Sequence, residues 1–73
     1  MDVTRPALLK RAGARDLAIC DGRQVIGHVV AFDSPAASHA YDADERHLGE
    51  FRTYRVAAAA VSARAAHESE AGR

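Results

Sequence analysis

The sequence predicts an α+β domain, in which a small antiparallel sheet of three to four strands is packed by one C-terminal helix. Short apolar runs separated by Gly, Pro and Asp occupy residues 17 to 51, and this pattern is typical of strands joined by turns. An alanine-rich run follows at residues 57–60 and favours a helix. With 73 residues the chain has room for one domain with a small core.

The N-terminal region, residues 1–15, predicts either a short helix or a flexible, loosely docked arm. A helix would begin near Thr4, since Pro6 is favourable in a first turn, and it would end before Gly13. Leu8 and Leu9 are its apolar anchors. We expect residues 16–66 to form the single α+β domain and residues 67–73 to form a disordered tail.

A hairpin is predicted around Asp21 and Gly22, because an Asp-Gly pair is favourable in a two-residue type I′ loop. This loop would place Ile19 opposite Gln24. The following strand, residues 23–32, alternates apolar side chains on both of its sides, so we expect it to be central or to be covered on one side by a partner. Gly27 is expected to mark a bulge or a close approach of another backbone.

A loop around Pro35 and a second hairpin come next. Residues 38–42 and 47–51 are the expected strands, and residues 43–46 are the turn between them. Gly49 indicates a position where a side chain is not accommodated.

Thr53 is suited to cap a helix that spans about residues 54–66. The expected buried stripe is composed mostly of methyl groups, which allows the helix to lie close to the sheet. This stripe contains Tyr54, Ala58, Val61 and Ala65, with Val56, Ala60 and Ala63 beside it.

Charge and cysteine content narrow the function classes. Ten basic and ten acidic residues cancel, so no overall field attracts nucleic acid or an anionic membrane. No apolar run approaches the roughly 20 residues that cross a bilayer, and Lys10 and Arg11 interrupt any signal-peptide core. The single Cys20 cannot form an intramolecular disulfide, and we expect a cytoplasmic protein.

The chain lacks a recognisable catalytic or metal-binding motif, and we expect neither an enzyme nor a cofactor. The segment that starts at Asp42 and Asp44 resembles a calcium loop, but its sixth and twelfth positions are His47 and Thr53 rather than Gly and Glu. Cys20 has no activating base nearby and is expected to be buried in a strand. The histidines lack the close pairing that metal sites use: His28, His39, His47 and His67.

The start of the predicted helix carries Arg52 and Arg55, where the helix dipole disfavours cations. Either solvent screens this effect, or these arginines, together with Arg46, face an anionic partner or pair with Glu50. The candidate partner-binding residues are Asp42, Asp44, Glu45, Arg46, Glu50, Arg52 and Arg55.

The segment from Gly27 to Val61 carries Tyr41-Asp-Ala-Asp44, Leu48-Gly49, Phe51 and Thr53 ahead of an alanine-rich helix. It resembles small proteins of phages and mobile elements, and the resemblance covers about half of the chain. Similar hairpin-plus-helix layouts occur in the arm-binding domains of phage integrases and in plant ethylene-response-type DNA-binding domains. Those sheets carry outward Arg and aromatic residues, whereas this hairpin mixes acidic residues with its arginines.

Three functions are therefore weighed. The leading hypothesis is a non-catalytic protein-binding module of phage or mobile-element type, for example an anti-CRISPR-like inhibitor of a bacterial defence complex. The alternative is a small DNA-binding domain that uses Arg46, Arg52 and Arg55 with a basic N-terminal arm. The third is a structural homodimer formed through an open sheet face or a free strand edge. Homodimerisation is compatible with the first two, and we expect it because the core is small.

Overall fold

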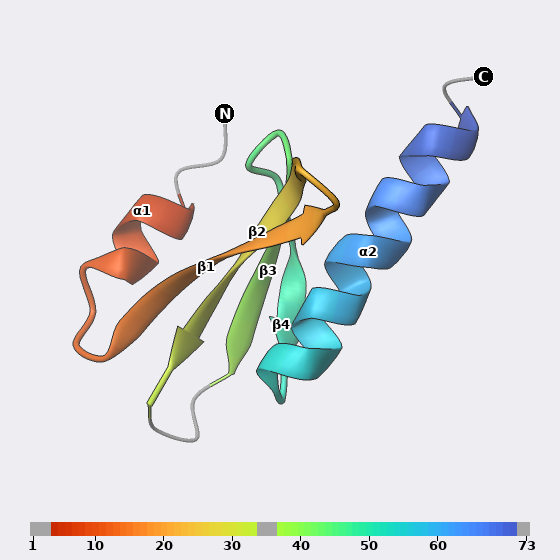
Figure 1. Cartoon of the computed structure of the whole chain (residues 1–73). Coiled ribbons are helices and arrows are strands. Elements are labelled where there is room, and N and C mark those ends of the chain that lie inside the picture. Colours follow the sequence, from red (N-terminus) through yellow and green to blue (C-terminus); the bar gives the residue numbers. More distant parts are fainter. Residues whose placement is uncertain (1–3, 34–36, 72–73) are drawn as a thin grey trace.

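The computed structural model describes residues 4–33 and 37–71, with side chains described up to residue 67. Four strands form one antiparallel sheet in the order β1-β2-β3-β4. Helix α1 lies on one side of the sheet and α2 on the other (Figure 1), which confirms the predicted α+β class. The elements are α1 (Thr4–Leu9), β1 (Ala14–Asp21), β2 (Gln24–Phe32), β3 (Ser38–Asp42), β4 (His47–Phe51) and α2 (Tyr54–Ala71).

The first hairpin turns one residue later than expected. Asp21 pairs with Gln24, so the two loop residues are Gly22 and Arg23 rather than Asp21 and Gly22. Gly22 has a φ of 63°, and glycine at the first loop position is the pattern of a type II′ turn. The predicted register was wrong because Gly22 takes the first loop position instead of the second.

A bulge in β2 shifts the register a second time. Cys20 pairs with Val25 and Ile19 pairs with Gly27, which leaves Ile26 as the extra residue. An extra residue changes the side of the sheet to which the following side chains point. Ile26 therefore packs in the same cluster as Val29, whereas regular alternation along β2 would place it on the side of Val30.

Strand β2 is central and buries apolar side chains on both of its sides, as its sequence predicts. On the α2 side, the buried residues are Ile19, Val29, Ala40, Ala57 and Val61. On the α1 side, Leu8 packs with Val30 and Tyr41. The N-terminal region therefore contributes a docked helix that supplies the cover for the second side of β2.

Gly27 lies where β2, β3 and α2 come close together. A Cβ atom at this position would overlap the carbonyl oxygen of Tyr41 and would lie 2.5 Å from Cγ1 of Val61. The close approach predicted from the sequence is confirmed. It allows Val61, which is fully buried, to press directly against the strand backbone.

The second hairpin has the strand limits that the sequence predicts. Ala40 pairs with Gly49 and Tyr41 pairs with His47, so Leu48 is an extra residue in β4. Gly49 has a φ of 147°, a conformation that residues with a Cβ rarely adopt. The preceding loop, expected around Pro35, lies mostly outside the described residues.

Helix α2 starts where the sequence predicts and ends later. The amide of Val56 donates to Oγ1 of Thr53 at 3.2 Å, which confirms the cap. The helix continues to Ala71, so the disordered tail expected from residue 67 was wrong over residues 67–71. The first glycine after the cap is Gly72, and nothing before it interrupts a helix.

The side of α2 that faces the sheet is also narrower than expected. Ala57 and Val61 are fully buried, whereas Tyr54 and Val56 are 44% and 50% exposed. Both were expected in or beside the buried stripe. Burial against the sheet begins at Ala57, so the apolar side chains before it stay about half exposed.

We expect Gly27→Ala to destabilise the fold by at least about 2 kcal/mol, because the new methyl group overlaps backbone and forces β2, β3 or α2 apart. Urea unfolding followed by circular dichroism measures this. Gly22→Ala is the matched control, since nothing lies near its added Cβ and only its positive φ is unfavourable, by about 1 kcal/mol. Equal losses in the two variants would contradict the close approach.

Candidate functional site

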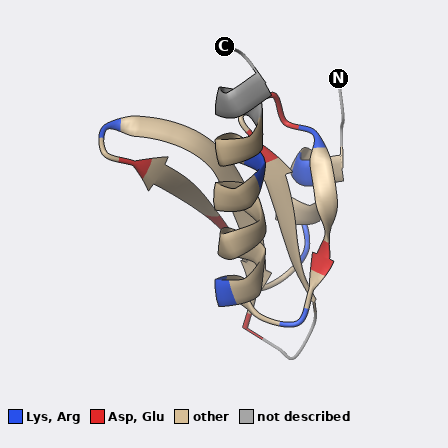
Figure 2. Ribbon diagram, turned by 90° about the vertical axis from the view of Figure 1, so that its right-hand side faces the viewer, with Lys and Arg blue, Asp and Glu red and all other residues tan. Residues whose placement is uncertain are grey.

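The start of α2 presents a continuous exposed segment, residues 52–56, with the sequence Arg-Thr-Tyr-Arg-Val. Every residue in it is exposed. Among the described residues, the side chains of Arg52 and Arg55 make no hydrogen bond or ion pair. Figure 2 shows the basic positions at the start of α2, at one end of the molecule. We call residues 52–56 the helix-start segment.

Two local features give this segment its geometry. Thr53 caps the helix through its side chain, and its carbonyl oxygen accepts the amide of Ala57 at 3.1 Å. The first residue of α2 buried against the sheet is Ala57. Residues 52–56 are therefore held by the cap while their side chains project into solvent.

Asp42, a predicted partner-binding residue, is buried and stabilises a turn. It is 2% exposed, and its Oδ1 accepts the amides of Asp44 and Arg46, both at 2.9 Å. These bonds form the Asx-type turn between β3 and β4, in which Glu45 has a φ of 69°. Asp42 therefore does not contribute to the exposed surface, because its carboxylate holds the backbone of the turn.

The other predicted residues do not form one surface. Asp44 and Arg46 are exposed in the turn that precedes β4, whereas Arg52 and Arg55 follow β4 at its opposite end. Five residues of strand span roughly 16 Å, so Arg46 does not join the helix-start segment. Glu50 is exposed on β4. In the β3–β4 register it lies opposite His39, not opposite an arginine.

A polar network that the sequence analysis missed joins α1 to the sheet. Arg5 donates to both oxygens of Glu45 at 2.6 and 2.7 Å, and its other guanidinium nitrogens bond to Asp16. The ring of His28 lies 3.4 Å from the guanidinium. The bond to Asp16 is the strongest influence on the pKa of Arg5, which is raised although burial opposes the shift. This network fastens the N-terminal helix to β1 and to the β3–β4 turn.

His39 and His47 form a second polar group on the same side of the sheet. Nδ1 of His39 lies 3.0 Å from Nε2 of His47. The rings of His39 and Phe32 pack in a T-shaped arrangement, and the guanidinium of Arg11 lies over the Phe32 ring. Burial is the main cause that lowers the pKa of His39; the charge of Glu50 opposes this shift, and His47 and Arg11 add to it.

Within the described part of the chain, no three His, Cys, Asp or Glu side chains are grouped as metal ligands. Cys20 is exposed on β1, so the expectation of a buried strand cysteine was wrong. Leu17 also lies on this outer strand, and 37% of its surface is exposed. Neither described helix combines the length and apolarity needed to span a membrane.

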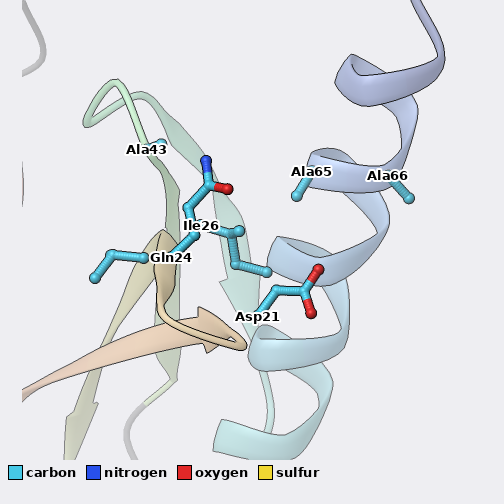
Figure 3. A pocket seen from close by; sticks show the side chains of 7 residues that line it. Asp21, Gln24, Ile26, Ala43, Ala65 and Ala66 are labelled. Atoms are coloured by element: carbon cyan, nitrogen blue, oxygen red, sulfur yellow. The ribbon is translucent and has the colours of Figure 1, made fainter.

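A groove of about 500 Å³ opens between the tip of the β1–β2 hairpin and the C-terminal half of α2. Figure 3 shows Ala65 on α2 across the groove from Ile26 on β2. Its walls are mixed, because the polar side chains of Asp21 and Gln24 lie beside apolar ones, and they mark where the helix diverges from the sheet. The lining residues are Asp21, Gln24, Val25, Ile26, Ala43, Ala65 and Ala66.

Comparisons with protein-family models, with curated proteins and with solved structures found no match for this chain.

The lowered pKa of His39 predicts that the fold loses stability as the pH falls. Below about pH 6.5, His39 binds a proton in the unfolded chain but stays neutral in the folded chain. The free energy of unfolding therefore decreases as the pH falls, until the pH passes the lower pKa of the folded state. We expect the urea midpoint to fall between pH 7.5 and pH 5.5, and His39→Gln to reduce this fall. The measurement is urea unfolding across that range.

His67→Gln is the matched control, because His67 is exposed on α2. This variant should keep the full pH dependence. If His39→Gln and His67→Gln behave alike, His39 is not the group that links protonation to unfolding.

Proposed function

We propose that this chain is a non-catalytic protein-binding module of phage or mobile-element type, and that the helix-start segment docks on its partner. The observation that carries the proposal is the exposed Arg-Thr-Tyr-Arg-Val run, whose two arginines have no side-chain partner in the described chain. Tyr and Arg are the residue types that most often dominate binding energy in protein interfaces.

The charge of this segment indicates an acidic partner surface. Two guanidinium groups flank Tyr54, and each can form paired hydrogen bonds with a carboxylate. Tyr54 and Val56 supply apolar area between and beside them, and about half of each is available for contact. A partner that offers carboxylates around an apolar pocket fits both features.

Stability does not account for these arginines. The N-terminus of an α-helix carries partial positive charge, so a cation in its first turn costs about 0.3 to 1 kcal/mol. Arg55 lies in the first turn of α2, and Arg52 directly precedes the cap. Side chains that weaken the fold yet remain unpaired are expected where a partner supplies the opposite charge.

Inhibition of a bacterial defence complex is the concrete form of the proposal. The resemblance of residues 27–61 to small proteins of phages and mobile elements supports this form. An inhibitor of this kind acts by occupying a surface of the larger complex. CRISPR surveillance complexes are therefore the first partners to test.

We expect the double variant Arg52→Glu/Arg55→Glu to bind a purified surveillance complex about 30-fold more weakly, or worse, than the unmodified chain. The same variant should unfold at higher urea concentration, because both charges now suit the helix N-terminus. Biolayer interferometry and urea unfolding give the two readouts. Weaker binding together with higher stability indicates that the arginines dock the partner, whereas a structural role predicts that stability is lost as well.

Lys10→Glu/Arg23→Glu is the matched control, with the same change of charge at exposed positions outside the segment. It should bind like the unmodified chain. Equal weakening in both double variants would contradict the assignment of the segment. Failure of the unmodified chain to bind any surveillance complex, together with a salt-dependent gel shift of DNA, would favour the DNA-binding alternative instead.

A further inference from the structure

Strand β1 is an open sheet edge. It occupies an outer position in the strand order, and of its eight residues only Ile19 is buried. It contains no proline, and the bulge in the first hairpin falls on β2 rather than on β1. An uninterrupted outer strand presents backbone donors and acceptors to which another strand can pair.

The opposite edge, β4, is shorter than β1 and is interrupted by a bulge. Strand β4 has five residues, Leu48 forms a bulge in it, and Gly49 departs from extended geometry with a φ of 147°. Short length and bulges are devices that prevent edge pairing. Of the two outer strands, β1 is therefore the one that can accept a partner strand.

The sequence of β1 is complementary to itself when read in the opposite direction. A two-fold axis through Ala18 places Arg15 opposite Asp21 of a second copy, and it places Leu17 opposite the second copy's Ile19. Each pair occurs twice because of the symmetry. Opposite charges and apolar pairs directly across two strands are both favourable.

Neighbouring registers lose this complementarity. A two-fold axis keeps each side chain on its own side of the sheet, so the axis must be centred on a residue, and the nearest alternatives are centred on Leu17 and on Ile19. An axis through Leu17 places Arg15 opposite Ile19, and an axis through Ile19 places Leu17 opposite Asp21. The register centred on Ala18 is thus favoured over its neighbours by charge and by apolar pairing.

We propose that β1 pairs antiparallel with β1 of a second copy about a two-fold axis through Ala18, which joins two four-stranded sheets into one. Leu17, 37% exposed, gains an apolar neighbour there. Within one chain Arg15 forms an exposed ion pair with Asp33 at 2.8 Å, and in the dimer Asp21 of the second copy is an alternative partner for the same guanidinium. The proposal is independent of the helix-start segment, which shares no residue with β1.

Cysteine cross-linking tests the register. In a Cys20→Ser background, Ala18→Cys places two thiols directly opposite each other, close enough for a disulfide. We expect a covalent dimer on a non-reducing gel after mild oxidation. The unmodified chain is the control, since Cys20 faces Asp16 of the second copy and lies about 13 Å from the other Cys20. A dimer cross-linked through Cys20 but not through Ala18→Cys would overturn the register.

Charge reversal tests the interface without a cross-link. We expect light scattering to give twice the 7.8 kDa mass of one chain. Asp21→Arg should raise the dimer dissociation constant at least about tenfold, because two arginines then face each other. Arg15→Asp/Asp21→Arg restores the opposite charges and should restore the dimer. Circular dichroism verifies that each variant is folded.

A monomer at every concentration of the unmodified chain would overturn the proposal, as would a dimer that both charge variants leave unchanged. Neither result bears on binding through residues 52–56. Conversely, loss of partner binding in the Arg52/Arg55 variant leaves the mass of the dimer as it was.

Discussion

Val61 of α2 presses against Gly27 of β2, and the position of the helix along the sheet depends on this contact. The other side chains near this side of α2 are mostly alanines, such as Ala57 and Ala58. A smooth row of methyl groups gives little resistance to sliding, because ridges and grooves are what hold packed elements in place. One valine in the space left by one glycine therefore sets the axial register of the helix.

That register determines which parts of the chain remain in solvent. With Val61 held at Gly27, burial of α2 against the sheet begins at Ala57, and residues 52–56 before it are exposed. The helix packs mainly on β2, β3 and β4. Of β1, only Ile19 is buried in the core beneath the helix, and Leu17 on the same side of the strand is exposed.

Features that depend on neighbouring residues could be predicted from the sequence. Thr53 as a cap, the second hairpin and the role of Gly27 each follow from local turn, cap or backbone chemistry. The ends of the first hairpin were missed by one residue, because both Asp21-Gly22 and Gly22-Arg23 are acceptable loops and the choice between them depends on packing. Tyr54 was expected to be buried because it is apolar, but a pattern of residue types does not show where a helix first meets a sheet.

Features that depend on distant residues could not be predicted in this way. Arg5 meets Glu45 across 40 positions of the chain, and His39 meets His47 only because β3 and β4 pair in a bulged register. The same holds for the docking of α1, since Leu8 is buried by side chains of β2 and β3. Of the seven predicted partner-binding residues, Asp42 is buried, and only Arg52 and Arg55 lie together in the helix-start segment.

In the proposed dimer, the unequal edges of the sheet limit each copy to one added strand. Because β4 is short and bulged while β1 is long and regular, a copy that has used β1 retains no second edge of the same kind. Growth by edge pairing then stops after a single addition instead of propagating into a filament. A bulge at Leu48, far from β1, is in this sense what keeps such an assembly finite.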